Sequence, residues 1–415
     1  MTTSRRDFLR YLSGSPLMLS LGLSAGSLAE LLASGDRGPG RIVDLLDQVS
    51  DADLITAADD ALSVFDFQRV AARTLPIAHY AYLATGTDSD DTLQANREGL
   101  ERLRLRMRRL ADVRDVDMSV DILGRRWETP IVIQPTGSNG AFHADAEIAV
   151  ARAAREKQHL QVLSTVASSS IEEVCAARGE PVWWQLYPSV DWDMTMAMIR
   201  RVESAGCPVM LLTVDLQGGS NRETMLRGGR ADDRDCAACH LDGVGSNRGR
   251  PIYDGLEIPA GGMARPGDMT WEYFARLKAA TSMRIGIKGI VTREDAELCV
   301  QYGADVLVVS NHGGRAEASA RSTIECLPEI AEAVGGRIPI IVDSGFRRGR
   351  DIFKGLALGA TAVGIGRPYL WGLAAFGQEG VEAVLELLRR ELQLIMRQAG
   401  TPSIDRIDSR YVVGE

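Results

Sequence analysis

The chain has 415 residues, a formal net charge of −9 and 45% hydrophobic residues. This length and apolar content suit one large α/β domain with its own hydrophobic core. The acidic balance does not indicate a nucleic-acid partner, because such partners are bound through an excess of basic side chains. The arginine-rich run at residues 101–110 alternates arginine with leucine and methionine, which predicts a half-solvated extended segment.

The amino terminus carries a separate signal. Residues 4–9 (SRRDFL) resemble a twin-arginine export signal, and a moderately apolar stretch with a small-residue cleavage site at residues 27–29 follows. That stretch is too short and too weakly apolar for a membrane span. We therefore expect residues 1–29 to direct the protein to the periplasm or out of the cell. The alternative is an ordinary amphipathic helix in a cytoplasmic protein.

The rest of the chain repeats a short apolar strand, a polar or glycine-rich turn and an amphipathic helix. Before this repeat, residues from about 42 to 83 are expected to form a helical extension. The expected strands are residues 131–134, 161–163, 182–186, 209–214, 284–287, 306–309, 338–342 and 362–365. Eight such units in roughly 250 residues predict a closed (β/α)8 TIM barrel at about 113–390, in a domain of residues 42–404 followed by a C-terminal tail at 405–415.

Every expected strand ends in polar, charged or glycine residues although its body is apolar. Parallel barrels place their chemistry at this carboxyl end of the strands. The eight ends together therefore predict a functional rim. Its residues include Pro135, Thr136, Gly137, Ser164, Gln185, Tyr187, Thr213, Asp215, Lys288, Ser310, His312, Asp343, Gly345, Gly366 and Arg367.

One connection is far longer than the others. Residues 216–283 separate the fourth strand from the fifth, whereas βα loops usually have two to six residues. Only its last part, about Thr270 to Lys278, has a helical pattern. An insertion of this length at the active face of a barrel predicts a lid, a partner surface or an accessory site.

The stretch from Val306 to Arg315 (VLVVSNHGGR) dominates the functional interpretation. A helix precedes its strand, and Thr292 with Asp295 gives that helix an N-terminal capping pattern. The strand then delivers His312 and Arg315 at the rim. Two glycines between them let the backbone turn sharply, so the imidazole and the guanidinium can converge on one small ligand.

Residues 310–315, Ser-Asn-His-Gly-Gly-Arg, resemble the signature of the FMN-dependent α-hydroxy acid oxidases and dehydrogenases. That family includes glycolate oxidase, lactate oxidase, mandelate dehydrogenase and the flavin domain of flavocytochrome b2. The resemblance covers nearly all of the chain from about residue 75 to residue 404. It implies FMN as the cofactor and a small 2-hydroxy acid as the substrate.

A phosphate site is expected at the last two strand ends, where barrels commonly bind phosphate through backbone N–H groups at the start of a helix. Gly345, Arg347, Gly366 and Arg367 suit this role, because two arginines neutralise a dianion. The resemblance places Lys288 at the N1 and C2 carbonyl edge of the flavin. The other expected cofactor contacts are Pro135, Thr136, Gly137, Ser164, Gln185, Thr213, Ser310 and Asp343.

A 2-hydroxy carboxylate needs cations to hold its carboxylate. Arg315 and Arg222 suit a bidentate clamp, since guanidinium and carboxylate share a planar two-pronged geometry. Tyr82 would add a hydroxyl donor to the same carboxylate. These residues are expected to decide how the substrate is oriented.

The substrate also needs a base for the proton that it loses. The resemblance implies that His312 is this base and that Tyr187 addresses the substrate hydroxyl. Asp215 would hold the protonated form of His312, as a carboxylate beside an imidazolium should. Val166 stands where the family often has a large aromatic residue, which predicts room for a bulkier substrate.

Cys236, Cys239 and His240 form a motif inside the long connection, with the spacing of a c-type haem attachment site. A haem there would relay electrons away from the flavin. The alternatives are a local disulfide, another metal ion or free thiols.

The expected function is oxidation of a lactate-like (S)-2-hydroxy acid to its 2-oxo acid, with electrons passed through FMN to O2, a quinone or a cytochrome. Gly137, where oxidases of the family often have alanine, favours a dehydrogenase. The alternatives are another FMN-barrel enzyme of the isomerase type and a non-catalytic flavin or haem electron-transfer module. The resemblance also implies a homotetramer.

Overall fold

The structure is a computed structural model that describes residues 54–232, 249–258 and 265–414. By internal contacts the chain divides into residues 1–41 and 42–415, and all described elements belong to the second unit. The expected export signal at residues 1–29 and the motif of Cys236, Cys239 and His240 lie outside the described residues. None of the described helices combines the length and apolar character needed to cross a bilayer.

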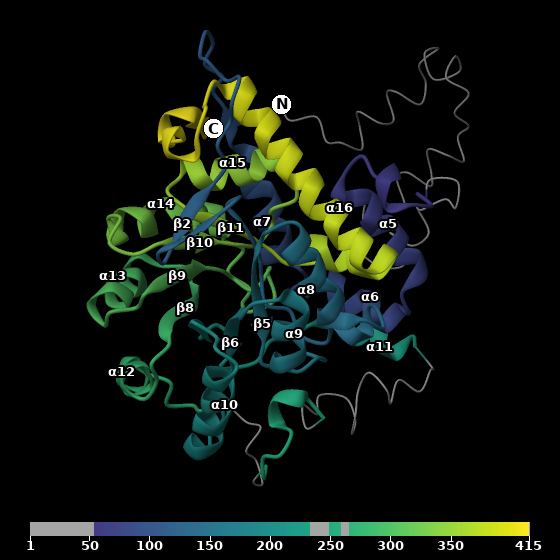
Figure 1. Ribbon diagram of the computed structural model, residues 1–415, viewed down its shortest axis with the longest axis vertical. Coiled ribbons are helices and arrows are strands. Elements are labelled where there is room, and N and C mark those ends of the chain that lie inside the picture. Colours follow the sequence, from purple (N-terminus) through teal and green to yellow (C-terminus); the bar gives the residue numbers. More distant parts are fainter. Residues whose placement is uncertain (1–53, 233–248, 259–264, 415) are drawn as a thin grey trace, which may run out of the picture. The chain divides into compact units, whose positions relative to one another are not determined.

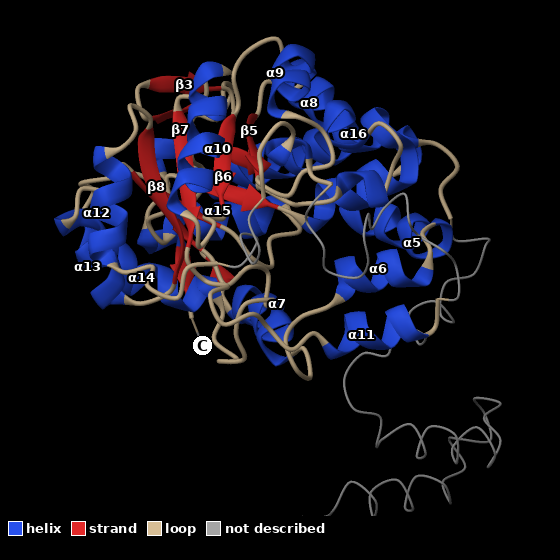
Figure 2. Cartoon of the chain, turned by 90° about the horizontal axis from the view of Figure 1, so that it is seen from below, coloured by secondary structure: helices blue, strands red, loops and turns tan. Residues whose placement is uncertain are grey.

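Within the described residues, eight parallel strands close into a barrel, which confirms the predicted fold (Figures 1 and 2). The strands are buried along almost their whole length, because the helices outside and the side chains inside cover both faces. In order around the barrel they are β10 (Ile340–Val342), β11 (Ala362–Ile365), β4 (Ile131–Ile133), β5 (Leu160–Ser164), β6 (Trp183–Leu186), β7 (Val209–Thr213), β8 (Arg284–Ile290) and β9 (Val306–Val309).

Helices follow the strands and surround the barrel (Figure 2). The predicted cap before β9 is confirmed, because the Thr292 hydroxyl accepts a hydrogen bond from the backbone N–H of Asp295. From β4 onward the helices after the strands are α8 (Ala146–Glu156), α9 (Ile171–Arg178), α10 (Trp192–Ser204), α12 (Trp271–Ala279), α13 (Arg293–Gln301), α14 (Thr323–Val334), α15 (Gly349–Ala357) and α16 (Arg367–Ala399).

The expected helical extension precedes the barrel. It consists of η3 (Ala58–Asp60), α5 (Val64–Thr74), α6 (Ile77–Ala84) and α7 (Asp91–Arg102). The extension is interrupted between α5 and α6, because Pro76 keeps Leu75 in extended backbone and a new helix begins at Ile77. Helix α5 packs against α16, which fixes the extension to the barrel.

The long connection contains a helix that the sequence pattern missed. Besides η5 (Pro251–Tyr253) and α12, it forms α11 (Glu223–Arg230), so the prediction that only its last part is helical was wrong. Two adjacent glycines make α11 a poor helix on local propensity. Its packing explains its presence: a Cβ at Gly228 would lie 2.3 Å from the Cβ of Ala81 on α6, so a tertiary contact requires the glycine.

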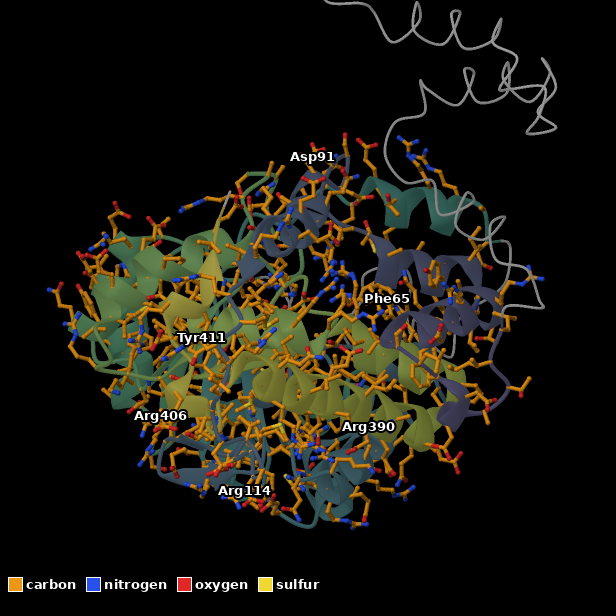
Figure 3. All side chains as sticks on the ribbon, turned by 90° about the horizontal axis from the view of Figure 1, so that it is seen from above. Phe65, Asp91, Arg114, Arg390, Arg406 and Tyr411 are labelled. Atoms are coloured by element: carbon orange, nitrogen blue, oxygen red, sulfur yellow. The ribbon has the colours of Figure 1, made fainter. Side chains whose placement is uncertain are left out.

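Two small antiparallel sheets complete the fold. A hairpin of β2 (Val120–Ile122) and β3 (Arg125–Trp127) packs its apolar side chains with those of the barrel interior. Strand β1 (Arg104–Leu105) pairs with β12 (Val412–Val413), after η6 (Ile404–Arg406) and η7 (Ser409–Tyr411). The extended segment predicted for residues 101–110 therefore begins at Leu103, because α7 extends to Arg102. The Tyr411 ring is buried, with its centroid 5.8 Å from that of Phe353 (Figure 3).

Candidate active site

A cavity of about 810 Å³, partly open to solvent, lies at the carboxyl ends of the barrel strands. Most of the residues predicted from the sequence line it, so the eight strand ends do meet in one rim. These lining residues are Tyr82, Pro135, Thr136, Gly137, Ser164, Tyr187, Lys288, His312, Arg315, Asp343, Gly345, Arg347, Gly366 and Arg367.

Five predicted residues lie next to the lining rather than in it. The Ser164 hydroxyl donates to Gln185 Oε1 at 3.1 Å. Thr213 ends β7, in register with Lys288 on β8. Arg222 lies just before α11 and donates through Nε to Ser220 Oγ at 2.8 Å. The remaining two, Asp215 and Ser310, contact lining residues directly.

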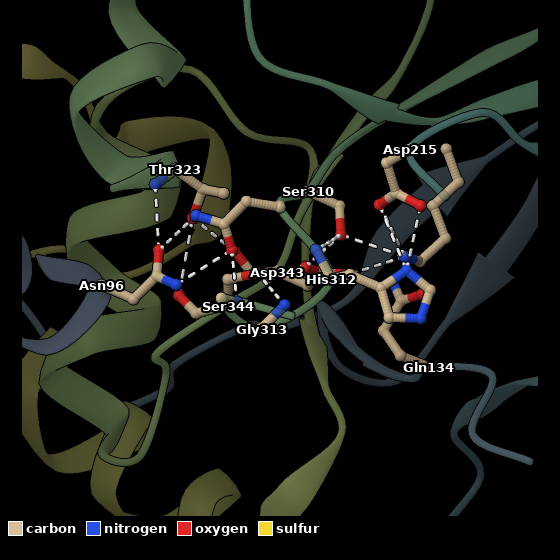
Figure 4. Close-up of polar contacts among 12 residues, drawn as sticks. Asn96, Gln134, Asp215, Ser310, His312, Gly313, Thr323, Asp343 and Ser344 are labelled. Atoms are coloured by element: carbon tan, nitrogen blue, oxygen red, sulfur yellow. Dashed lines mark hydrogen bonds and ion pairs between the residues drawn. The ribbon is translucent and has the colours of Figure 1, made fainter. Parts of the chain in front are cut away.

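His312 is held between a carboxylate and a phenol. Its Nδ1 lies 3.0 Å from Asp215 Oδ1, and its Nε2 lies 3.3 Å from the Tyr187 hydroxyl (Figure 4 shows the pair with Asp215). A carboxylate accepts but does not donate, so Nδ1 carries the proton and Nε2 keeps its lone pair. The basic nitrogen therefore lies on the Tyr187 side, in the cavity that both side chains line.

Burial lowers the pKa of His312 to about 4. The Asp215 carboxylate favours the charged imidazolium, but Lys288 and Arg315 oppose it, and desolvation is the largest effect. Burial opposes the ionised form of Asp215, but the positive charge of Lys288 and the hydrogen bond from His312 help to lower its pKa, so Asp215 remains ionised. Burial, with the nearby Asp215 carboxylate, raises the pKa of Tyr187, so its phenol keeps its proton. At neutral pH the site thus presents an unprotonated imidazole.

Lys288 is anchored at the floor of the site. Its Nζ donates to Ser310 Oγ at 3.0 Å, and Ser310 donates in turn to Asp343 Oδ1 at 2.7 Å. The same ammonium lies 3.9 Å from Asp215 and 4.0 Å from Asp343. Only 5% of the Lys288 side chain is exposed, so a buried positive charge is fixed at the centre of the rim.

A pair of buried amides, which the sequence did not reveal, supports the loop after β9. Asn96 on α7 and Asn311 exchange two side-chain hydrogen bonds of 2.9 and 2.8 Å (Figure 4). Asn311 Oδ1 also accepts from the backbone N–H of Gly314. His312 has φ +59°, a left-handed conformation that is uncommon for a non-glycine residue and needs such support.

Arg315 is buried beneath Tyr82. Its Cζ lies 4.3 Å from the Tyr82 ring centroid, and its Nη1 donates to the Tyr82 carbonyl. Burial lowers the pKa of Arg315 to about 9; Tyr82 opposes this shift, and the charge of Arg222 adds to it. Arg315 and Arg222, the two arginines predicted to bind the substrate carboxylate, are therefore close enough to repel each other. Such a pair of cations is suited to bind one anion between them.

The loops after β10 and β11 form the predicted phosphate end of the cavity. Gly345 has φ +89°, and a Cβ there would lie 2.5 Å from the Asn96 carbonyl oxygen, so only glycine fits. Gly366 precedes the first residue of α16, whose N-terminus faces this end. Arg347 is buried and Arg367 is half-buried, and desolvation lowers the pKa of Arg367 to about 10. Arg367 also donates to the carbonyls of three surrounding residues.

Several buried polar atoms at the rim have no hydrogen-bond partner among the described residues. They are Nε2 and Oε1 of Gln134, Nε2 of Gln185 and Oγ1 of Thr213. Buried polar groups are costly unless they are paired, so this set indicates a ligand with both donors and acceptors. Gln134 lines the cavity but was predicted only as the end of a strand; its polar side chain after Ile133 was the available signal.

The profile of the FMN-dependent dehydrogenase family matches residues 71–414. The chain belongs to this family. The FMN-dependent dehydrogenases use FMN, and the rim fits that cofactor: the unpaired polar atoms suit the polar edge of the flavin, and Gly345, Gly366, Arg347 and Arg367 suit its phosphate.

Named relatives agree with this assignment. The chain is 39% identical over 345 residues to 4-hydroxymandelate oxidase of Amycolatopsis orientalis, covering 83% of this chain and 96% of the relative. It is 36% identical over 354 residues to a peroxisomal (S)-2-hydroxyacid oxidase of Arabidopsis thaliana, covering 85% and 97%. A soluble mutant of the membrane-associated (S)-mandelate dehydrogenase from Pseudomonas putida superposes with a TM-score of 0.78 at 32% identity, covering 85% of this chain and 99% of that chain.

Other lining residues were not among those predicted for the site. They are Leu83, Gly313, Ser344, Phe346, Gly364 and Leu370. Gly364 acts through its size, since a Cβ there would lie 2.3 Å from Gln134 Nε2. Most of these residues shape the walls with apolar side chains or with glycine, whereas the Ser344 hydroxyl accepts from the Gly313 N–H and donates to Asp343 Oδ1.

Proposed function

We propose that the protein oxidises a short (S)-2-hydroxy acid to the 2-oxo acid, with FMN as the acceptor of the two electrons. The observation that carries this proposal is the placement of His312, whose Nε2 lies in the FMN-binding cavity while Asp215 holds Nδ1. The names of similar proteins support the substrate class, since they act on 2-hydroxy acids, glycolate, lactate or mandelate.

Arg315 and Arg222 bind the substrate carboxylate, and Tyr82 contributes its hydroxyl. Binding an anion here relieves the repulsion between the buried Arg315 and the half-buried Arg222, so the free energy of the empty clamp favours a carboxylate. The Tyr187 hydroxyl, 3.3 Å from His312 Nε2, marks where the hydroxyl of the substrate lies.

Oxidation removes two electrons and two protons from the substrate carbon and its hydroxyl. His312 Nε2 takes one proton, and Asp215 stabilises the imidazolium that forms. Bound FMN supplies the acceptor for the electron pair and the other proton. Lys288, fixed by Ser310 between two aspartates, stabilises negative charge at the far edge of the cofactor.

We further propose that the protein is a dehydrogenase with a quinone or cytochrome acceptor. Gly137 lines the cavity, and a Cβ at this position would lie 2.4 Å from Val166 Cγ2. The alanine that oxidases of the family often have at this position would therefore displace Val166, so the surroundings of residue 137 suit the glycine that favours a dehydrogenase. Steady-state rates with O2 compared with an artificial quinone test this choice, and faster turnover with O2 would reverse it.

Anaerobic reduction of the purified holoenzyme tests the main proposal. We expect at least one acid among glycolate, lactate, mandelate and longer 2-hydroxy acids to bleach the FMN absorbance within seconds. If none of them reduces the flavin, the proposal fails, and the isomerase or non-catalytic electron-transfer alternatives gain support.

Three further proposals rest on sequence alone. Residues 1–29 form an export signal, which fractionation of cells and N-terminal sequencing of the mature protein would test. Cys236, Cys239 and His240 hold a disulfide, a haem or another metal, or remain free thiols, and the absorbance spectrum distinguishes haem by its Soret band. The proposed homotetramer is tested by the molar mass that light scattering gives as the protein elutes from a size-exclusion column.

A further inference from the structure

Arg265 lies in the long connection, shortly before α12, and reaches the wall of the active site. Its Cζ is 4.0 Å from the centroid of the Tyr187 ring, whose hydroxyl is 3.3 Å from His312 Nε2. Its Nη1 donates to the carbonyl of Leu216 at 2.6 Å, which fixes the direction of the guanidinium. A cation is thus held one aromatic ring away from the proposed base.

Other cations of the site have anionic partners, present or expected. Lys288 lies between Asp215 and Asp343. Arg347 and Arg367 face the phosphate of FMN, and Arg315 and Arg222 face the substrate carboxylate.

Arg265 differs from all of these. Among the described residues, its contacts are the Leu216 carbonyl and the Tyr187 ring, and it forms no ion pair. Asp215 is near enough to interact with its charge, but that carboxylate already bonds to His312 and neutralises Lys288. The half-buried Arg265 guanidinium, stacked on a ring that lines the cavity, therefore has no anionic partner among the described residues.

The contacts that hold Arg265 leave most of its N–H donors available for a ligand. Stacking on Tyr187 uses the face of the guanidinium, whereas its N–H donors point outward in the plane. An arginine has five such donors, and the structure commits one of them to Leu216. A preorganised guanidinium of this kind binds a carboxylate through two parallel hydrogen bonds.

We propose that the substrate is a 2-hydroxy dicarboxylate and that Arg265 binds its second carboxylate. This inference rests on the proposed function and names the substrate class of the same site. The first carboxylate lies in the clamp of Arg315 and Arg222, the 2-hydroxyl lies at Tyr187 and His312, and the side chain of the substrate extends toward the connection after β7.

Pairs of substrates with equal carbon number provide the test. Anaerobic reduction of the flavin is measured with (S)-2-hydroxysuccinate against (S)-2-hydroxybutyrate, and with (S)-2-hydroxyglutarate against (S)-2-hydroxypentanoate. We expect the second-order rate constant of flavin reduction to be about 10- to 100-fold higher for the diacid of at least one pair, the range of one or two charge-assisted hydrogen bonds.

The variant Arg265→Met should remove this preference while leaving the monoacid rates within about threefold. Arg276→Met is the matched control, because Arg276 belongs to the same connection and stacks on an aromatic ring, with its Cζ 3.5 Å from the Trp192 centroid. Trp192 does not line the cavity, whereas Tyr187, the ring beneath Arg265, does. The affinity for the 2-oxo diacid, read from the flavin absorbance in the absence of turnover, should fall with the diacid rate in Arg265→Met alone.

The outcomes distinguish failure of the dicarboxylate inference from failure of the proposed function. Reduction by monoacids with no advantage for either diacid overturns the dicarboxylate inference and leaves the proposed function intact. An equal loss for monoacids and diacids in Arg265→Met also overturns it, because Arg265 would then act by positioning Tyr187. Absence of reduction by all four acids and by glycolate, lactate and mandelate would reject the proposed function itself.

Discussion

The two sides of the substrate site are built differently. On the side of β9 and β10, Ser310, Asn311 and Asp343 are buried and each forms several side-chain hydrogen bonds. On the side of the long connection, Arg222 and Arg265 are half-buried, and the structure gives each of them one hydrogen bond within the described residues. The first side holds the reacting groups at fixed positions, and the second presents charge to the part of the substrate that does not react.

This difference indicates a division of labour. A base must stand within hydrogen-bond reach of one proton, so its loop needs the dense network around Asn311. Substrate choice requires only that the right groups be near, and loops on a rigid barrel supply it at little cost to the fold. Substitutions on the two sides should therefore change different kinetic constants.

The largest effect is expected for His312→Gln. Loss of the base should lower the rate of flavin reduction by about 10²–10⁴-fold, because proton transfer contributes on that scale. The FMN content should remain at the wild-type level, since His312 is held by Asp215 and not by the phosphate end. Rapid-mixing absorbance measures the rate, and an unchanged rate would remove His312 from its proposed role.

Arg222→Met should produce the contrasting result on the other side of the site. We expect KM to rise about 10- to 100-fold, the range of one or two lost charge-assisted hydrogen bonds, while kcat changes less than tenfold. Steady-state kinetics with a single 2-hydroxy acid gives both constants. A fall confined to kcat would show that this arginine acts in the chemical step and would erase the proposed difference between the two sides.

The pH profile tests the buried side without a mutation. Because burial lowers the pKa of His312 to about 4, its neutral form persists well below the ordinary imidazole range. The kcat/KM should therefore be flat from about pH 8 to pH 5.5, where a base with an unperturbed pKa of about 6.5 would already have lost roughly tenfold. Arg315 keeps its charge throughout this range, because even a pKa lowered to about 9 lies above pH 8. A fall in kcat/KM centred near pH 6.5 would contradict the lowered pKa of His312.

The smallest effect concerns stability. Asn96→Ala leaves the amide of Asn311 without its partner on α7 and should cost about 1–3 kcal/mol, measured by chemical denaturation of the holoenzyme. Asn221→Ala is the matched control, because Asn221 is exposed on the connection side and bonds to Asp88. That control should stay within about 0.5 kcal/mol of wild type. Equal losses of stability in both variants would contradict the view that the β9 side of the site is the more constrained.

The sequence predicted the barrel and most of the rim because both depend on short-range patterns. Apolar runs that end in polar residues located all eight strands, and their common direction brought Lys288, His312 and Asp343 together. The Asn96–Asn311 pair was missed because its members are 215 residues apart, and a single sequence contains no record of such pairing.

The long connection was harder to predict for a different physical reason. Helix α11 depends on a glycine that fits against Ala81 on α6, so its stability comes from tertiary packing and not from local propensity. Arg265 likewise gained its interpretation only from the ring of Tyr187 beneath it. Neither contact produces a hydrophobic periodicity or a motif in the sequence.

The pairing of β12 with β1 has a consequence for biosynthesis. Val412 and Val413 are synthesised long after Arg104 and Leu105, yet they supply the partner strand for that pair, and Tyr411 packs against Phe353. This part of the fold therefore cannot close until Val412 and Val413 have left the ribosome. A chain truncated before Val412 would leave an open strand edge, which invites aggregation.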